Sequence, residues 1–172
     1  SWSAFFRNLS TFELSVNNQY IFLTRNFDPT RTPGATPLPA NTGYTFNQAT
    51  VLYQSNMAQL ISYNAESTVG QFYNGQNATL RGSLSFRYQP WILFSLAFNY
   101  SGIRLPEPYA DADIWLVSPK VDVTFSKSLF WSTLVQYSNQ RNNLGLNSRL
   151  QWRFAPLSDL YLVYNDNYFT DN

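Results

Sequence analysis

The chain contains no cysteine and no histidine. Without cysteine it can form no disulfide, no thiolate metal site and no thiol nucleophile. Without histidine it lacks the side chain that most often serves as a general base or a metal ligand. Nucleophilic machinery of the Ser-His or Cys-His type is therefore excluded within this chain.

Charge and glycine-rich motifs are also scarce. Asp, Glu, Lys and Arg make up 12% of the 172 residues, whereas typical soluble domains contain about 25%. A net charge of +1 gives no concentrated basic surface of the kind that nucleic acids require. None of the seven glycines belongs to a phosphate-binding motif. We therefore predict no enzyme activity, no cofactor, no metal site and no nucleic-acid partner.

Long hydrophobic runs are missing as well. A membrane-spanning helix needs about 20 mostly apolar residues, and unbroken apolar runs such as residues 91–94 are far shorter. The first residues, Ser1 to Ala4, have neither the basic start nor the apolar core of a signal peptide. This start is expected either for a cytosolic chain or for a processed or partial piece of a longer one.

Aromatic residues are abundant, at 18% of the chain, and they alternate with polar residues. In residues 144–154, one parity carries Leu150 and Trp152 while the other carries Arg149 and Arg153. Only a β-strand separates two such sets onto opposite faces. The same pattern predicts further strands at 80–88, 92–101, 115–125, 129–138 and, with weaker polarity, at 12–22, 44–54 and 57–68.

The connections between these strands alternate in length. We predict long loops near 26–43, 69–77, 102–112 and 139–143, with short turns between them. In an up-and-down sheet, alternate connections lie at the same end, so one end carries the long loops. This asymmetry, together with strands of about 10–12 residues, is typical of outer-membrane β-barrels. The predicted fold is an all-β, antiparallel, up-and-down transmembrane β-barrel.

The parities also predict which side chains face the lumen and which face the lipid. Arginines could line a pore that favours anionic or polar solutes, although a structural charge ladder is the expectation that we favour. The predicted lumen-facing polar residues are Arg81, Arg87, Lys120, Asp122, Arg149, Gln151 and Arg153. Aromatic residues near strand ends form interfacial girdles in such barrels. The predicted lipid-facing and girdle residues are Trp91, Tyr100, Trp115, Trp131, Tyr137, Trp152 and Phe154.

Two competing interpretations stay open. A soluble β-barrel or β-sandwich that binds a hydrophobic or carbohydrate ligand would also alternate, but with charged residues facing outward.

Glu107, Asp111 and Asp113 cluster in or just beyond one predicted loop and could in principle hold Ca²⁺. A solvated loop explains this acidic cluster better, because it has no glycine-centred metal-binding motif.

Five short segments carry a resemblance to known proteins: GQFYNG at 70–75, IRLP at 103–106, VQYSN at 135–139, NSRLQWR at 147–153 and SDLYLVYN at 158–165. From about Thr68 to Asp166, the chain resembles a bacterial family that joins an N-terminal family-nine-type carbohydrate-binding module to a C-terminal outer-membrane-like β-barrel of unassigned role. This resemblance implies a β-barrel. The sugar-binding module itself has no counterpart here, so its ligand is not carried over to any residue.

With a further strand after the short turn at 155–158, nine strands are predicted, and residues 5–8 look like the end of a preceding strand. Single-chain bacterial barrels have an even number of strands, so we expect residues 1–172 to be one segment, a fragment of a larger barrel. The expected location is the bacterial outer membrane, and the expected role is that of a pore, an anchor or a subunit of a transport or assembly complex. The expected partners are outer-membrane lipid and other membrane or periplasmic proteins.

Overall fold

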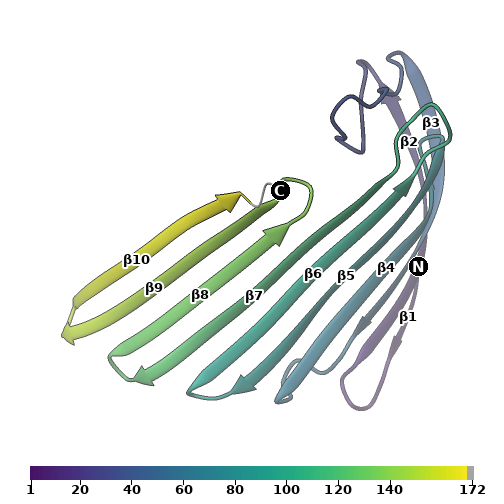
Figure 1. Cartoon of the computed structure of the whole chain (residues 1–172). Coiled ribbons are helices and arrows are strands. Elements are labelled where there is room, and N and C mark those ends of the chain that lie inside the picture. The colour runs from purple at the N-terminus through teal and green to yellow at the C-terminus, as the bar shows by residue number, and fades with distance from the viewer. Residues whose placement is uncertain (170–172) are drawn as a thin grey trace. The chain divides into compact units, whose positions relative to one another are not determined.

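The computed structural model describes residues 1–169. In this range the chain forms ten β-strands and no helix. Each strand pairs with the next one along the chain, so the sheet order is β1 to β10 in sequence (Figure 1). The predicted antiparallel up-and-down sheet is thereby confirmed. The closed barrel is not, because β1 and β10 are the two edges of the described sheet.

Most strands are 12 to 15 residues long, which is about twice the usual length in globular proteins. Their bounds are β1 Trp2–Phe5, β2 Thr11–Leu23, β3 Thr42–Gln54, β4 Ile61–Phe72, β5 Gly75–Tyr88, β6 Ile92–Arg104, β7 Ala112–Ser126, β8 Leu129–Ser138, β9 Asn143–Ala155 and β10 Ser158–Phe169. No helix among the described residues is long and apolar enough to cross a membrane.

The predicted count of nine strands is wrong by one. The tenth is β1, which pairs antiparallel with β2 from Trp2 opposite Leu14 to Phe5 opposite Thr11. Strand β1 has only four residues. This is too short for an alternating pattern to be recognised, so the sequence indicates the strand only through the segment around Phe5.

The predicted long loop at 69–77 is also wrong. Strand β4 continues to Phe72 and β5 begins at Gly75, so only residues 73 and 74 connect them. The other long connections lie close to their predicted places, at residues 24–41, 105–111 and 139–142. The connection at 55–60 is longer than the short turn expected there, so the long and short connections do not alternate strictly.

By their internal contacts the residues form two compact units. Unit 1 comprises Ser1–Gln54, Ala65–Arg81 and Tyr100–Ile114, and unit 2 comprises Ser55–Asn64, Gly82–Asn99 and Trp115–Asn172. Each unit is described by itself below. Both are built from antiparallel strands, so in each unit side chains alternate between two faces of a sheet.

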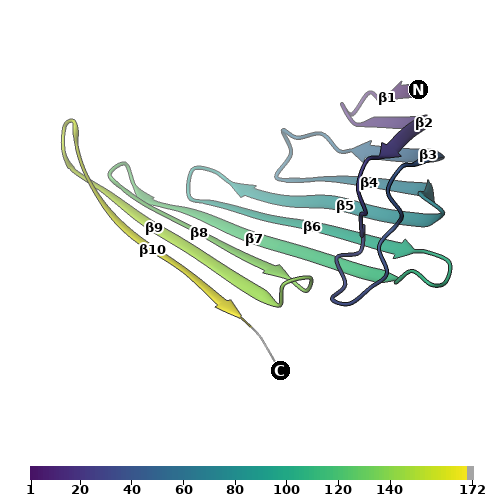
Figure 2. The same ribbon diagram turned by 90° about the horizontal axis from the view of Figure 1, so that it is seen from above.

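Unit 1 contains a small hydrophobic core. Leu38 and Phe46 are the two largest side chains that are fully buried. Leu38 lies in the 24–41 loop, the dark segment that leaves β2 and returns to β3 in Figure 2. The loop is closed on itself by a bridge in which Phe27 and Leu38 exchange backbone hydrogen bonds of 3.1 and 2.8 Å. The loop therefore supplies the residue that packs at the centre of this core.

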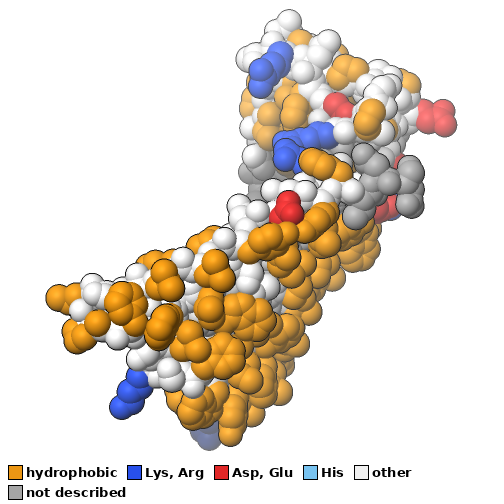
Figure 3. All heavy atoms as spheres, turned by 60° about the vertical axis from the view of Figure 1, so that its left-hand side comes forward, with side chains coloured by type: hydrophobic (Ala, Val, Ile, Leu, Met, Phe, Trp, Pro, Cys, Tyr) orange, Lys and Arg blue, Asp and Glu red, His pale blue; other side chains and the backbone are white. Residues whose placement is uncertain are grey.

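Unit 2 has no buried hydrophobic side chain among its described residues. Its strands β7 to β10 instead form a single layer. Their registers place apolar side chains opposite apolar ones and polar side chains opposite polar ones in most pairs. Hydrophobic side chains gather over this unit in the space-filling view (Figure 3). The unit is held together by backbone pairing and cross-strand contacts within one sheet, without a core of its own.

Candidate functional site

The registers of unit 2 separate its two faces clearly. On one face, Trp131 lies opposite Leu150, which lies opposite Leu162. On the other face, Ser132 lies opposite Arg149 and next to Asp122 of β7. Alternation in each strand thus adds up to an apolar face and a polar face across neighbouring strands. The polar face is the candidate functional surface, because the predicted lumen-facing residues of this unit share its parity.

Three of the predicted lumen-facing cations form ion pairs. The ammonium of Lys120 lies 2.8 Å from the carboxylate of Asp122, and Arg153 lies 3.1 Å from Asp159. In unit 1, Arg81 lies 3.7 Å from Glu66. These pairs are the contacts that a structural charge ladder would make. All are substantially exposed, so each contributes at most about 1 kcal/mol to stability.

A hollow of about 390 Å³ lies on unit 2 around Arg149. Besides Arg149, it is lined by Asp122, Val123, Thr124, Phe130, Trp131, Ser132, Asn147 and Gln151. Three predicted lumen residues, Asp122, Arg149 and Gln151, are therefore brought together. The Asp122 carboxylate is already engaged, since it accepts a 2.6 Å hydrogen bond from the Ser132 hydroxyl and pairs with Lys120.

Arg149 differs from the paired cations. Its guanidinium donates a weak 3.4 Å hydrogen bond to Gln151 and lies 4.5 Å from the centre of the Tyr161 ring. Within residues 1–169, no carboxylate lies at ion-pair distance from it. The remaining predicted cation, Arg87, is half-buried in β5, outside the lining of this hollow. Arg149 is therefore the cation of the hollow that is left for a ligand.

The polar face of unit 1 has a second hollow, of about 340 Å³. Its polar lining includes Gln48, the Glu66–Arg81 pair, and the hydroxyls of Thr50 and Thr68, which lie 2.9 Å apart. The Gln48 amide donates to the Gln71 backbone oxygen at 3.2 Å, so each of these groups already has a partner. The surface can accept a polar solute by hydrogen bonding, but it offers no unpaired charge.

An aromatic cluster closes one end of that face. Phe46 contacts Phe72 and Tyr73 at ring-centre distances of 5.9 and 5.8 Å, and Tyr44 and Phe27 also pack on Tyr73. Tyr73 lies in the turn after β4. Burial raises the pKa of its phenol, and the nearby Tyr44 hydroxyl raises it further. The phenol of Tyr73 is therefore neutral and packs as part of the core.

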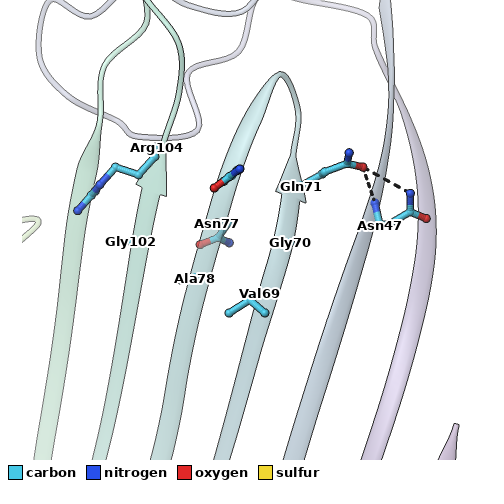
Figure 4. Close-up of a pocket in the computed structure, with 9 residues that line it drawn as sticks. Asn47, Val69, Gly70, Gln71, Asn77, Ala78, Gly102 and Arg104 are labelled. Atoms are coloured by element: carbon cyan, nitrogen blue, oxygen red, sulfur yellow. Dashed lines mark hydrogen bonds between the residues drawn. The ribbon is translucent and has the colours of Figure 1, made fainter.

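A groove of about 570 Å³ lies at the loop end of unit 1 (Figure 4). It is lined by Asn47, Val69, Gly70, Gln71, Gln76, Asn77, Ala78, Gly102 and Arg104. The Gln71 amide oxygen accepts from the backbone and the side chain of Asn47 at 3.2 and 3.4 Å. Arg104 points away from these amides in Figure 4 and is bound to Asp113 through two hydrogen bonds. The groove thus offers amide groups but no free acid or base.

The predicted aromatic girdle residues lie mainly on the apolar parity. Trp115, Trp152 and Phe154 are 47%, 49% and 59% exposed, which is unusual for such large side chains. The Trp131 indole donates a 2.9 Å hydrogen bond to Ser148 on the same face. The others are Tyr137 within β8, Tyr100, whose hydroxyl donates to Asp113 at 2.7 Å, and Trp91 in the connection before β6.

The acidic cluster near the 105–111 loop is used for local structure. Asp111 accepts the Leu105 backbone amide at 2.9 Å, and Asp113 is held by Arg104. In the part of the chain that the structure describes, no three acidic side chains come together as a metal site would require.

Sequence reasoning missed the aromatic side chains of the polar face. Phe130 and Tyr161 lie on either side of Gln151 in the β8–β9–β10 register. Their parity with Ser132 and Asp159 was visible in the sequence, but both residues resemble ordinary girdle aromatics there. Only the register places them beside Arg149.

Comparison with known proteins gives no match to a family model, to a curated protein or to a solved structure. The resemblance to the family with a carbohydrate-binding module and a barrel remains a prediction.

Proposed function

We propose that this chain contributes membrane-spanning β-strands to a bacterial outer-membrane protein, with its apolar face in lipid and its polar face along an aqueous passage for polar solutes. The observation that carries the proposal is the separation of faces in unit 2. Soluble antiparallel sheets cover their apolar face with a second layer. The corresponding face of unit 2 remains exposed, with Leu160 at 55% and Leu162 at 69%.

The hydroxyl groups on the apolar face support the same proposal. The Ser148 hydroxyl accepts from the Trp131 indole and lies 2.8 Å from the Thr133 hydroxyl. In β10, the Tyr164 hydroxyl donates to Asp166 at 2.9 Å and lies 2.8 Å from the Tyr168 hydroxyl. Polar groups in a membrane must be satisfied within the protein, because lipid tails offer no hydrogen bonds.

Strand length and strand-end chemistry are consistent with a tilted span. A transmembrane β-strand needs about 9–11 residues, and β6 to β10 meet this length. The apolar parity becomes polar near strand ends, at Asp113 in β7 and at Asp166 in β10. Such a change is expected where strands leave the hydrocarbon and enter the headgroup region.

Folding into lipid vesicles tests the proposal. The urea-unfolded chain is diluted into phosphatidylcholine vesicles and the vesicles are floated on a density gradient. We expect the chain to float with the vesicles and to resist added protease. A chain that is folded, soluble and protease-resistant without lipid or detergent would contradict the proposal. Planar-bilayer conductance then separates an open passage, which conducts, from an anchor, which does not.

A further inference from the structure

Arg149 has the surroundings of a ligand-binding cation. Asp122, Ser132 and Arg149 lie side by side on neighbouring strands. The Asp122 carboxylate forms an ion pair with Lys120 at 2.8 Å and accepts a hydrogen bond from the Ser132 hydroxyl at 2.6 Å. Arg153, four residues further along the same strand, is paired with Asp159. The guanidinium of Arg149 thus keeps its charge on the polar face without a protein counter-ion among residues 1–169.

The position of this guanidinium is restricted. Its central carbon, Cζ, lies over the Tyr161 ring at 4.5 Å from the ring centre, and one of its nitrogens donates a weak 3.4 Å hydrogen bond to Gln151. A guanidinium has five N–H groups, and cation–π attraction to a ring together with one hydrogen bond leaves others free to donate. Such a fixed fork matches the two oxygens of a carboxylate.

The hollow beside Arg149 also has an apolar wall. Phe130 lines it from β8, where it lies opposite Gln151 in the register. A phenyl ring in a hollow that also contains a cation offers a surface on which a flat apolar group can stack. Thr124, Ser132 and Asn147 complete the lining with small polar groups.

We propose that this hollow binds small aromatic acids, with the carboxylate on Arg149 and the ring against Phe130. The inference deepens the proposed function, because it names the class of solute that the polar face would select. It rests on that function only for its biological setting. Binding is measured on the folded chain in detergent, and membrane insertion is measured separately by vesicle flotation, so failure of one is distinguishable from failure of the other.

The first test compares three probes on the unmodified chain, folded in a non-ionic detergent. Equilibrium dialysis against radiolabelled benzoate, benzamide and acetate is corrected with protein-free micelles. Benzamide keeps the ring and loses the charge, whereas acetate keeps the charge and loses the ring. We expect benzoate to bind more tightly than either. Absence of benzoate binding, or benzamide binding as tight as that of benzoate, would overturn the proposal.

The second test uses variants matched along one strand. Arg149→Gln should weaken benzoate binding by roughly tenfold to a hundredfold, as expected for loss of charge-assisted hydrogen bonds. Arg149→Lys should lie between this variant and the unmodified chain, because it keeps the charge but not the fork. The control Arg153→Gln removes an arginine that already has a carboxylate partner and should bind benzoate as the unmodified chain does.

Circular dichroism of each variant shows whether the sheet has formed. Equal benzoate affinity in folded Arg149→Gln and in the unmodified chain would overturn the proposal. An equal loss in Arg149→Gln and Arg153→Gln would also overturn it, since general positive charge would then explain the binding. The comparison of the three probes needs no substitution and decides the question even if a variant fails to fold.

Discussion

The two units differ in whether their apolar side chains are buried or exposed. In unit 1 the 24–41 loop packs on the sheet, and every buried hydrophobic residue of the described chain lies in this unit: Leu23, Leu38, Phe46, Ile103 and Leu105. Among the residues of unit 2 up to Phe169, no apolar side chain is buried, and large ones such as Trp152 and Leu162 are 49% and 69% exposed. Unit 1 therefore has a buried core of its own, whereas the apolar side chains described in unit 2 stay at least partly exposed.

The stability of the two units should depend differently on the medium around them. A protein core contributes to stability in any solvent, because it removes apolar surface from water within the chain itself. An exposed apolar face contributes only when lipid or detergent replaces water against it. Substitutions in unit 1 should therefore act through packing, and those on the apolar face of unit 2 should act through contact with the membrane.

The largest effect is expected at the core of unit 1. Phe46→Ala should lower the free energy of unfolding by about 3–5 kcal/mol, because it leaves a cavity beside Phe72 and Tyr73. Urea titration of the vesicle-folded protein measures this change. The matched variant Phe154→Ala, at a side chain that is 59% exposed, should cost much less. Equal losses would show that the core of unit 1 is not its main source of stability.

The next effect concerns the apolar face of unit 2. Leu150→Arg should destabilise the vesicle-folded protein by roughly 2–4 kcal/mol, because it places a charge in lipid. Leu150 lies between Trp131 and Leu162 across neighbouring strands, away from the sheet edge. The neighbouring variant Arg149→Gln changes the polar face and should cost far less. Similar losses for the two would mean that the faces are not in different solvents.

The smallest effect is expected from glycine-to-alanine substitutions, which test how closely the backbone is packed in each unit. A Cβ at Gly75 would collide with the backbone oxygen of Arg104 and come within 2.9 Å of the Leu105 Cα. Gly75→Ala should therefore cost about 1–3 kcal/mol, as overpacking usually does. At Gly145 the nearest atoms are the end of the Asn167 side chain at 3.1 Å and a backbone oxygen at 3.9 Å.

The Gly145→Ala variant is the control, since its one close neighbour is the end of a side chain that can move. Both variants are compared by the midpoint of urea unfolding in vesicles. A larger shift for Gly145→Ala than for Gly75→Ala would contradict the view that unit 1 is the more tightly packed of the two.

The strands of unit 2 were predictable from sequence because their two parities differ so strongly. Residues 144–154 and 129–138, identified by alternation alone, correspond to β9 (Asn143–Ala155) and β8 (Leu129–Ser138). Under the proposed function, water lies on one face and lipid on the other, so each position carries a clear preference. The hollow around Arg149 was partly predictable for the same reason, as its arginine and Gln151 share a parity.

The strands of unit 1 were less predictable because, near the end that carries the long loops, apolar side chains lie on the polar parity and polar side chains lie on the other. Phe46 and Phe72 line the otherwise polar hollow of unit 1, and Phe27 of the 24–41 loop packs on Tyr73 of the same aromatic cluster. On the opposite parity, Asn47 and Gln71 bond to each other. Alternation breaks down at this reversal, which explains the wrong loop at 69–77. The cover supplied by a distant loop cannot be seen in a local pattern.

The most direct test of the central claim uses two neighbouring residues of β10. Leu162 lies on the apolar parity opposite Leu150, and Val163 lies on the polar parity opposite Arg149. Both are exposed, at 69% and 57%, and the chain has no cysteine of its own. Single cysteines at these two positions therefore report the solvent on each face separately.

In vesicle-folded protein, the reaction of each cysteine with a water-soluble maleimide is followed over time. We predict rapid labelling of Val163→Cys in water and slow labelling of Leu162→Cys in lipid, because thiols react as thiolates and lipid suppresses their ionisation. Both variants should label rapidly once the protein is unfolded in urea. Equal rates in the folded protein, or faster labelling of Leu162→Cys, would contradict the assignment of the two faces to lipid and water.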